Sequence, residues 1–143
     1  MESNTEELTP FAHSANNRCF GCGPANPHGL HLEFLRAPDN SVVCNATISD
    51  SYEGPPGYVH GGMIATLLDE AMSKAVRASG CVAMTRHMEV DYRRPVPSGS
   101  PIHIVGRVTR SEGRKHWVAA SIRNESGVTL AEGKGLFIEV TPR

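Results

Sequence analysis

One segment of this chain, residues 60–79, has the periodicity of a helix, whereas the segments on both sides of it have the patterns of strands. Its apolar residues recur at i, i+1, i+4, i+5 and i+8, which places them on one helical face. They are Met63, Ile64, Leu67, Leu68, Ala71, Met72, Ala75 and Val76. Gly80 follows where a helix C-terminus is expected. A single long helix among strands has to bury this face against a sheet, and that requirement constrains the fold more than any other feature.

The strand patterns lie on both sides of this helix. Before it come the runs LHLEFL and SVVCNATI, separated by a turn at residues 37–40. After it, strands are expected at about 83–92, 101–110, 115–124 and 128–140, with turn-forming clusters between them. This order predicts an α+β fold, in which an antiparallel sheet of five to six strands carries the helix on one face.

Length and charge limit the domain organisation and the partners. We expect a flexible N-terminal segment at 1–17, which is polar and aperiodic, and a single domain at 18–143. A net charge of -1 gives no basic surface for nucleic acid or for an anionic membrane. The acidic start MESNTEEL is unlike a signal or transit peptide, so we expect a cytoplasmic protein. One helix covers only part of such a sheet, which favours a homo-oligomer.

The start of the helix is the first candidate site. Gly61 and Gly62 follow His60 and would let a substrate oxygen approach unpaired backbone N–H groups. His60 has two interpretations, as a catalytic base or as a residue that hydrogen-bonds locally at the helix start, and the second is favoured. Asp69, nine residues after His60, could act as a base or nucleophile. One helix would therefore carry two parts of an acyl-transfer site.

Two adjacent carboxylates compete for this role, and their neighbours separate them. Glu70 has Lys74 at i+4, which predicts a solvated ion pair and a structural role. Asp69 has no cation near it on the helix, and a carboxylate among apolar side chains is the kind whose proton affinity rises. We therefore expect Asp69 to be functional. The neighbours of Asp69 on the helix surface, at i-4, i+3, i+4 and i+7, are Ala65, Met72, Ser73 and Val76.

The strand at 83–92 and its end supply further candidates. Alternation places Thr85 off the core face, where its hydroxyl would position a water molecule or face solvent. Arg93 and Arg94 either bind phosphates of a nucleotide-bearing substrate or are ordinary surface residues. The core face would carry Met84, Met88, Val90 and Tyr92.

The runs EGPPGYVHGGMIATLLDEAM, AMTRHMEVDYRRPVP and SEGRKHWVAASI resemble the hotdog-fold thioesterases of the PaaI-like superfamily. Within it they are most similar to the group that includes the mammalian mitochondrial long-chain acyl-CoA thioesterases. The resemblance implies a sheet wrapped around one long central helix, in a homodimer or a tetramer built from two dimers. It also implies hydrolysis of a fatty or aryl acyl-CoA to the free acid and CoA, without a metal or a redox cofactor.

The same resemblance assigns roles by position. Asp69 would be the base or nucleophile, the Gly61 N–H would bind the oxyanion, and Thr85 of the partner subunit would position water. Gly54 stands where some relatives carry an asparagine that helps to bind the thioester, and the long-chain group shares this glycine. The expected substrate-binding residues are His60, Gly62, Gly54, Arg93 and Arg94.

A cysteine-containing loop precedes the first strand pattern. Cys19, Cys22, His28 and His31 have the spacing C-x2-C-x5-H-x2-H, and these side chains are zinc ligands in other proteins. The five residues between the pairs are too few for the usual zinc-finger spacing and contain two prolines. We interpret the loop as a lid or pocket wall in preference to a zinc site or a reactive dithiol, and we predict no metal.

Two rival functions remain at this point. A hotdog dehydratase or hydratase would act on a related thioester, and a non-catalytic module would only bind acyl-CoA. The acyl chain length stays open because methionines, which suit several ligand shapes, would line the pocket. They are Met63, Met72, Met84 and Met88.

Overall fold

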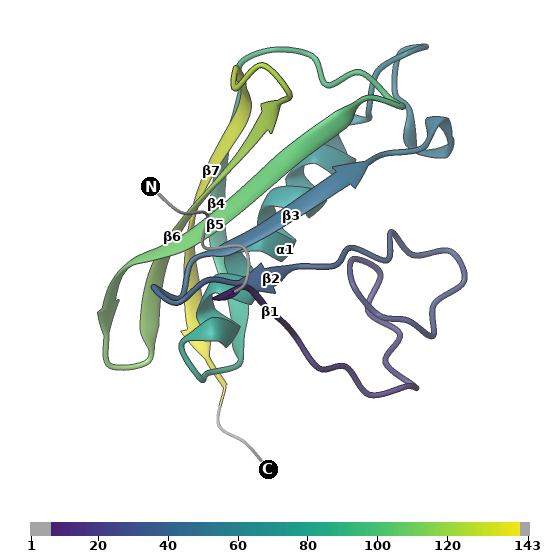
Figure 1. The fold of residues 1–143 in the computed structure, drawn as a ribbon. Helices are drawn as coiled ribbons and strands as arrows, with labels where there is room; N and C mark the ends of the chain where they lie inside the picture. Colours follow the sequence, from purple (N-terminus) through teal and green to yellow (C-terminus); the bar gives the residue numbers. More distant parts are fainter. Residues whose placement is uncertain (1–6, 141–143) are drawn as a thin grey trace.

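The computed structural model describes residues 7–140, in which one helix lies across the inner face of a curved antiparallel sheet (Figure 1). The helix, α1, spans Gly61–Ala78. A short 3-10 helix at Asp50–Tyr52 precedes it. The strands are β1 Thr9–Pro10, β2 Leu35–Arg36, β3 Val42–Thr47, β4 Ala83–Tyr92, β5 Pro101–Glu112, β6 Lys115–Asn124 and β7 Thr129–Glu139.

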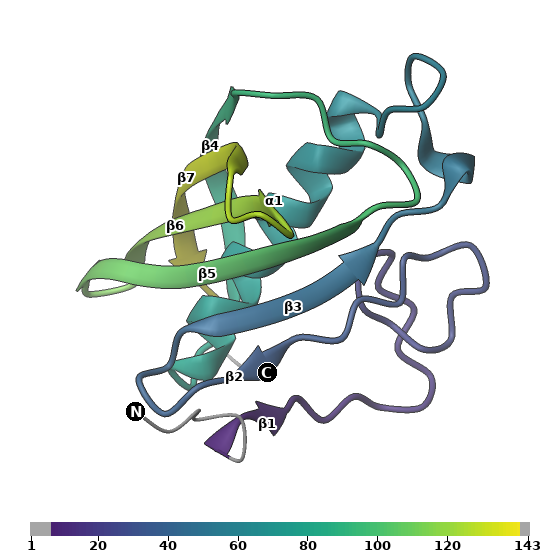
Figure 2. The same cartoon turned by 45° about the horizontal axis from the view of Figure 1, so that its top comes forward.

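The strands form one sheet in the spatial order β1-β2-β3-β5-β6-β7-β4, and every neighbouring pair is antiparallel. The chain leaves α1 and enters β4 at the far edge of the sheet, beside β7. Figure 2 shows how the sheet curves around α1. The predicted α+β class, with a sheet wrapped around one central helix, is therefore confirmed. In the described part of the chain, no helix is long and apolar enough to cross a membrane.

The helix is the element that the sequence located best. It begins and ends one residue inside the predicted range, because His60 is its N-cap and Ser79 its C-cap. Gly80 has a φ of 96°, a left-handed conformation typical of the residue that ends a helix. All but one of the residues assigned to its apolar face are buried, and Met63 packs against the core while partly exposed.

The N-terminal side of the sheet differs from the expected strand pattern. Only Leu35 of the run LHLEFL lies in a strand, although Leu32 and Phe34 are buried as the alternation indicates. Thr9–Pro10 adds a two-residue strand, so the sheet is larger than the predicted five to six strands. Two-residue strands leave no periodic pattern in a sequence. Residues 1–6 of the expected flexible segment lie outside the described residues, and the division at residue 17 stays a prediction.

A β-bulge in β4 changes which side chains face the helix. Thr85 pairs with Phe137 and His87 with Leu136, so Arg86 is an additional residue between two paired positions. The bulge places Thr85 on the inner face together with Met88 and Val90, which pack against the core. Met84 turns outward and is 63% exposed. The prediction of Met84 as a core residue is therefore wrong, because simple alternation does not include the bulge.

The helix packs against the sheet most closely at Gly106 of β5. A side chain there would overlap the backbone of Ala71, since a Cβ atom would lie 2.8 Å from its carbonyl carbon. A Cβ atom at Gly133 of β7 would instead make ordinary contacts of 3.4 Å with Leu68. Gly106 is therefore required for the distance between α1 and the sheet.

We expect Gly106→Ala to lower the free energy of unfolding by about 1–3 kcal/mol, because neither backbone can move without disturbing the core. Gly133→Ala is the matched control on the same face of the sheet, and its effect should be smaller. Urea denaturation followed by circular dichroism measures both. Equal losses for the two variants would contradict the assigned role of Gly106.

Candidate active site

His60 caps the start of α1. Its Nδ1 accepts a hydrogen bond of 2.9 Å from the N–H of Gly62, and its backbone has φ -59° and ψ 139°. A Cβ atom at Gly62 would lie 3.1 Å from Nδ1, so the absence of a side chain there permits the close approach. This contact is a local hydrogen bond at the helix start, the kind of role that the sequence favoured for His60. Gly54 lies behind the cap, where a Cβ atom would be 3.3 Å from the His60 Cα.

Gly61 combines a free N–H with a fixed carbonyl. The first N–H groups of a helix have no partner within it, and the Gly61 N–H has no acceptor among residues 7–140. The carbonyl oxygen of Gly61 accepts a hydrogen bond of 2.9 Å from the Tyr92 hydroxyl. Tyr92 was expected in the core but is 52% exposed, and it ties the helix start to the end of β4. Sequence reasoning missed this role, because no local signal marks which backbone group a tyrosine hydroxyl reaches.

Asp69 and Thr85 form a hydrogen-bonded pair beside β4. The Thr85 hydroxyl donates to Oδ1 of Asp69 over 2.5 Å, with the carboxylate half-buried and the threonine exposed. The bulge after Thr85 turns its hydroxyl toward the helix. The family resemblance implied a threonine from the partner subunit, whereas here the contact is made within one chain. The two residues assigned to catalysis are thus adjacent, at a site open to the surface.

The Asp69–Thr85 pair lies far from the free N–H of Gly61 at the start of α1. Gly61 and Asp69 are eight positions apart, and at 1.5 Å per residue this separates them by about 12 Å along the axis. A thioester carbon has to lie within about 3–3.5 Å of its nucleophile. One chain therefore does not bring the Gly61 N–H and the Asp69 carboxylate to the same carbon.

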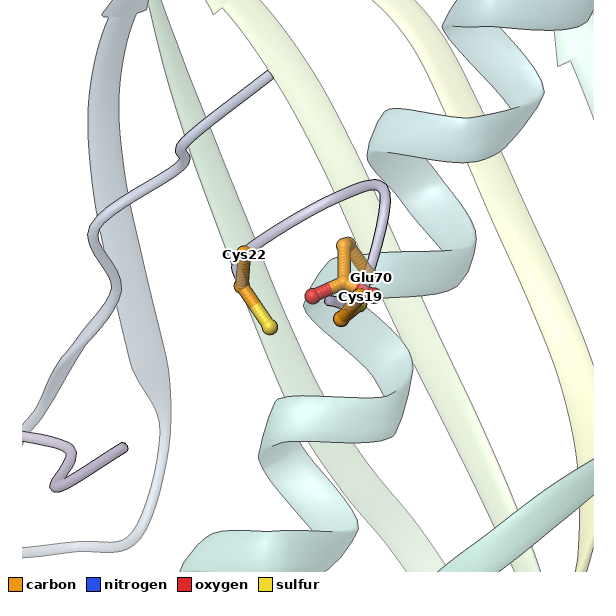
Figure 3. A group of neighbouring side chains, drawn as sticks. All are labelled: Cys19, Cys22 and Glu70. Atoms are coloured by element: carbon orange, nitrogen blue, oxygen red, sulfur yellow. Dashed lines mark hydrogen bonds between the residues drawn. The ribbon is translucent and has the colours of Figure 1, made fainter. Parts of the chain in front are cut away.

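Glu70 has different surroundings from those predicted. No ion pair between Glu70 and Lys74 forms in the described structure, because the ammonium of Lys74 lies 3.2 Å from Nε2 of His13. The Glu70 carboxylate instead lies against the loop that carries Cys19 and Cys22 (Figure 3). The prediction of a solvated ion pair between Glu70 and Lys74 is therefore wrong. The separation of Glu70 from the Asp69–Thr85 pair agrees with the predicted non-catalytic role of Glu70.

The two arginines after β4 are not equivalent. Arg93 is held by Asp91 at 3.2 Å and by Glu132 at 2.7 Å, so two carboxylates already neutralise its guanidinium. Arg94 has no ion pair within the described residues and lines a surface cavity together with Tyr58. The structure thus leaves Arg94 as the better candidate for a phosphate.

The fold separates the members of two further predicted groups, the Cys2His2 ligand set and the four methionines of the expected pocket. Among the loop residues, His31 Nε2 contacts the backbone oxygen of Asn26 at 2.6 Å, and His28 is exposed. The four methionines expected to line one pocket differ in burial, from Met72 in the core to Met84 at the surface. Neither the Cys2His2 group nor the methionine-lined pocket forms as a unit.

Residues 56–131 match the sequence family described as the thioesterase superfamily. The acyl-coenzyme A thioesterase THEM4 of Xenopus laevis is 37% identical over 111 residues, which cover 76% of this chain and 50% of that protein. The chain spans about half the length of the curated relatives it matches.

Solved structures share the fold. A thioesterase superfamily protein with 32% identity has a TM-score of 0.80, over 87% of this chain and 60% of that one. The PaaI protein of E. coli, at 20% identity, has a TM-score of 0.73 over 78% of this chain and 81% of its own. A Streptococcus mutans protein described as bound to acetyl CoA, also 20% identical, has a TM-score of 0.72 over 78% and 90% of the two chains. These neighbours confirm the fold that the motifs implied.

The capping contact of His60 generates a stability prediction. His60→Ala removes the acceptor of the Gly62 N–H, and we expect a loss of about 1 kcal/mol in the free energy of unfolding. His60→Asn restores a capping oxygen and should recover most of this loss. Thermal and urea unfolding of the three proteins measure the difference. An alanine variant as stable as the parent would contradict the capping role.

Proposed function

The chain belongs to the thioesterase superfamily, and on this premise we propose that it hydrolyses fatty or aryl acyl-CoA thioesters to the free acid and CoA. The observation that carries the proposal is the Asp69–Thr85 hydrogen bond beside β4, since a half-buried carboxylate oriented by a hydroxyl is a suitable base or nucleophile. The similarity to the Xenopus laevis acyl-CoA thioesterase supports the choice of substrate class.

The reaction needs only groups of the protein itself. The Gly61 N–H at a helix start polarises the thioester carbonyl and stabilises the oxyanion that develops there. In the first of two routes Asp69 attacks the carbonyl carbon and the C–S bond breaks, so that CoA leaves as its thiolate; water then hydrolyses the acyl-aspartyl anhydride to the free acid and supplies the proton of the CoA thiol. In the second route Asp69 takes a proton from a water molecule that Thr85 orients, the water oxygen attacks the carbonyl carbon, the C–S bond breaks, and the proton passes to the departing thiolate of CoA. Neither route requires a metal or a redox cofactor.

The site is completed by a second copy of the chain. The 12 Å between Gly61 and Asp69 supports an arrangement in which the oxyanion N–H and the Asp69–Thr85 pair at one thioester come from different subunits. The open edge of β4 supports this arrangement, because β4 pairs only with β7 among the described strands and exposes Met84 and Tyr92. A homodimer, or a tetramer built from two dimers, therefore carries two shared sites in each pair of chains.

The nucleotide part of CoA is proposed to lie beyond the helix start, at the surface cavity that Arg94 and Tyr58 line. Arg94 supplies a cation there that no carboxylate of the described residues neutralises, whereas Arg93 is already paired twice. His60, Gly62 and Gly54 border the thioester end. A cytoplasmic location stays a prediction.

Asp69→Asn should fold and assemble normally but lose turnover by a few orders of magnitude, because the amide neither attacks nor accepts the proton. Glu112→Gln, an exposed carboxylate near the tip of β5, is the matched control and should keep full activity. Release of free thiol from a panel of acyl-CoAs measures both. Near-normal turnover by Asp69→Asn on its best substrate would overturn the assignment. Water addition without thiol release would indicate a hydratase, and tight binding without either would indicate a binding module.

The shared site is tested with chains that each lack one part of it. Gly61→Pro deletes the N–H at the first helical position, where proline is tolerated and where the extended conformation of His60 is compatible with it. We expect a loss of about 10²–10³ in kcat. In mixed dimers of Gly61→Pro and Asp69→Asn chains, one of the two sites is intact, so about half of the parental activity per dimer should return.

Mixed dimers of Asp69→Asn and Thr85→Val chains are the control. If both residues act from one chain, every site in these dimers is defective and no activity returns. Recovery in this pair would show that Thr85 comes from the partner subunit, as the family resemblance implied. No recovery in the Gly61→Pro and Asp69→Asn pair would contradict the sharing of the oxyanion N–H between subunits.

A further inference from the structure

Two thiols and a carboxylate meet where the loop at residues 19–22 crosses α1. Figure 3 shows the side chains of Cys19 and Glu70 close together at the helix, with the side chain of Cys22 beside them. One ligand atom from each residue lies within 4.8 Å of the other two. The sulfur of Cys19 is 3.6 Å from Oε1 of Glu70. This group is separate from the Asp69–Thr85 pair, although Glu70 and Asp69 are neighbours in the sequence.

The Glu70 carboxylate lacks a partner that its surroundings require. Its Oε2 is buried and has no hydrogen-bond partner among residues 7–140. A buried carboxylate oxygen without a partner costs free energy, so such an atom usually marks a missing donor or ion. Lys74, the nearest cation on the helix by sequence, contacts His13 and lies beside Cys22, but within the described part of the chain it forms no ion pair with Glu70. The free oxygen of Glu70 therefore leaves room for a further cation supplied from outside the chain.

The loop is built tightly enough to hold its cysteines in place. Gly21 is buried and a Cβ atom there would overlap the Glu70 side chain, so the loop backbone lies directly on the carboxylate. The N–H of Gly23 donates to the Cys19 oxygen at 2.8 Å, and the N–H of Leu32 donates to the Gly21 oxygen at 2.8 Å. Both sulfur atoms are thus positioned by backbone hydrogen bonds on one side of a rigid helix.

The electrostatics of the group disfavour a reactive dithiol. Burial, followed by the charge of Glu70, raises the pKa of the Cys22 thiol to about 12, so without a cation this thiol stays protonated. A protonated thiol is a poor nucleophile. A divalent cation changes this balance, because two thiolates and one carboxylate carry three negative charges, which Zn²⁺ and the nearby Lys74 together compensate.

We propose that Cys19, Cys22 and Glu70 bind a zinc ion that fastens the loop to α1. Thiolate and carboxylate are zinc ligands, with Zn–S distances of about 2.3 Å and Zn–O distances of about 2.0–2.2 Å. A tetrahedral angle between such bonds separates sulfur and oxygen by about 3.6 Å, which is the distance between Cys19 Sγ and Glu70 Oε1. Water fills the fourth position. The cavity lined by Cys22, His13 and His31, of about 670 Å³, gives the ion access.

The ligand set differs from the one that the sequence spacing offered. His28 and His31 follow the cysteines in the chain, but the structure brings Glu70, 48 residues after Cys22, to the two sulfur atoms. The zinc would hold the residue next to Asp69, so the ion stabilises the helix segment that carries the catalytic carboxylate without touching the substrate.

The test uses the full chain after removal of metal by a chelator and titration with Co²⁺. We expect one equivalent to bind, with the near-ultraviolet absorption of sulfur-to-cobalt charge transfer, and Zn²⁺ to displace it. Zinc should also raise the Tm. The absence of sulfur-to-cobalt absorption would overturn the proposal.

Variants locate the site. Cys19→Ser and Cys22→Ser should abolish the charge-transfer absorption, and Glu70→Gln should weaken Co²⁺ binding about tenfold or more. Cys81→Ser is the matched control, because Cys81 with His116 and Glu139 forms the other group of ligand-type side chains in the described residues. Loss of absorption in Cys81→Ser with retention in the Cys19 and Cys22 variants would overturn the assignment. An unchanged Co²⁺ affinity in Glu70→Gln would exclude Glu70 as a ligand.

A further measurement uses the parent chain, so its result does not depend on whether the variants fold. Zinc should protect Cys19, the partly exposed cysteine of the loop, from maleimide modification and leave the modification of Cys81 unchanged. Equal modification of Cys19 with and without zinc would contradict the proposal. These readouts do not depend on thioesterase activity, so the failure of one proposal is distinguishable from the failure of the other.

Discussion

The close packing of α1 on the inner face of the sheet determines the positions of all the groups discussed above. Gly106 allows the two backbones to approach, and the apolar side chains of the helix fill the space on either side of this contact. Because the helix is rigid and its position is set by the core, its start, its middle and its end lie at defined places relative to β4. The groups proposed for catalysis and for metal binding are arranged along this one element.

Two neighbouring carboxylates on α1 face different surroundings as a result. Successive residues of a helix are about 100° apart around its axis, so Asp69 points toward β4 while Glu70 points toward the loop at 19–22. Asp69 finds a hydroxyl at the open edge of the sheet. Glu70 finds two thiols under a buried turn. The helix thus separates the exposed Asp69–Thr85 pair, proposed to be catalytic, from the enclosed group that we propose as a metal site.

The edge strand β4 links the fold to the proposed assembly. Its bulge turns Thr85 toward Asp69, and its last residue, Tyr92, holds the carbonyl of Gly61. Within residues 7–140 the same strand has a free edge, and it exposes apolar side chains. A strand that orients the site from one chain and is open to a second chain is consistent with an active site that is completed at the boundary between two subunits.

The sequence by itself determined the helix and the four long strands after it and singled out Asp69 as a candidate, because these depend on short-range periodicity and on neighbours within one helix. Tertiary structure alone decided the rest. The bulge that reverses Met84 and Thr85 arises from the pairing of β4 with β7, which no local pattern encodes. The contacts of Tyr92 with Gly61 and of Cys19 with Glu70 join residues 31 and 51 positions apart. Such contacts depend on how the whole chain closes around its core. Spacing along the sequence therefore suggested His28 and His31 as metal ligands beside the two cysteines, whereas the fold brings Glu70 of the helix to them.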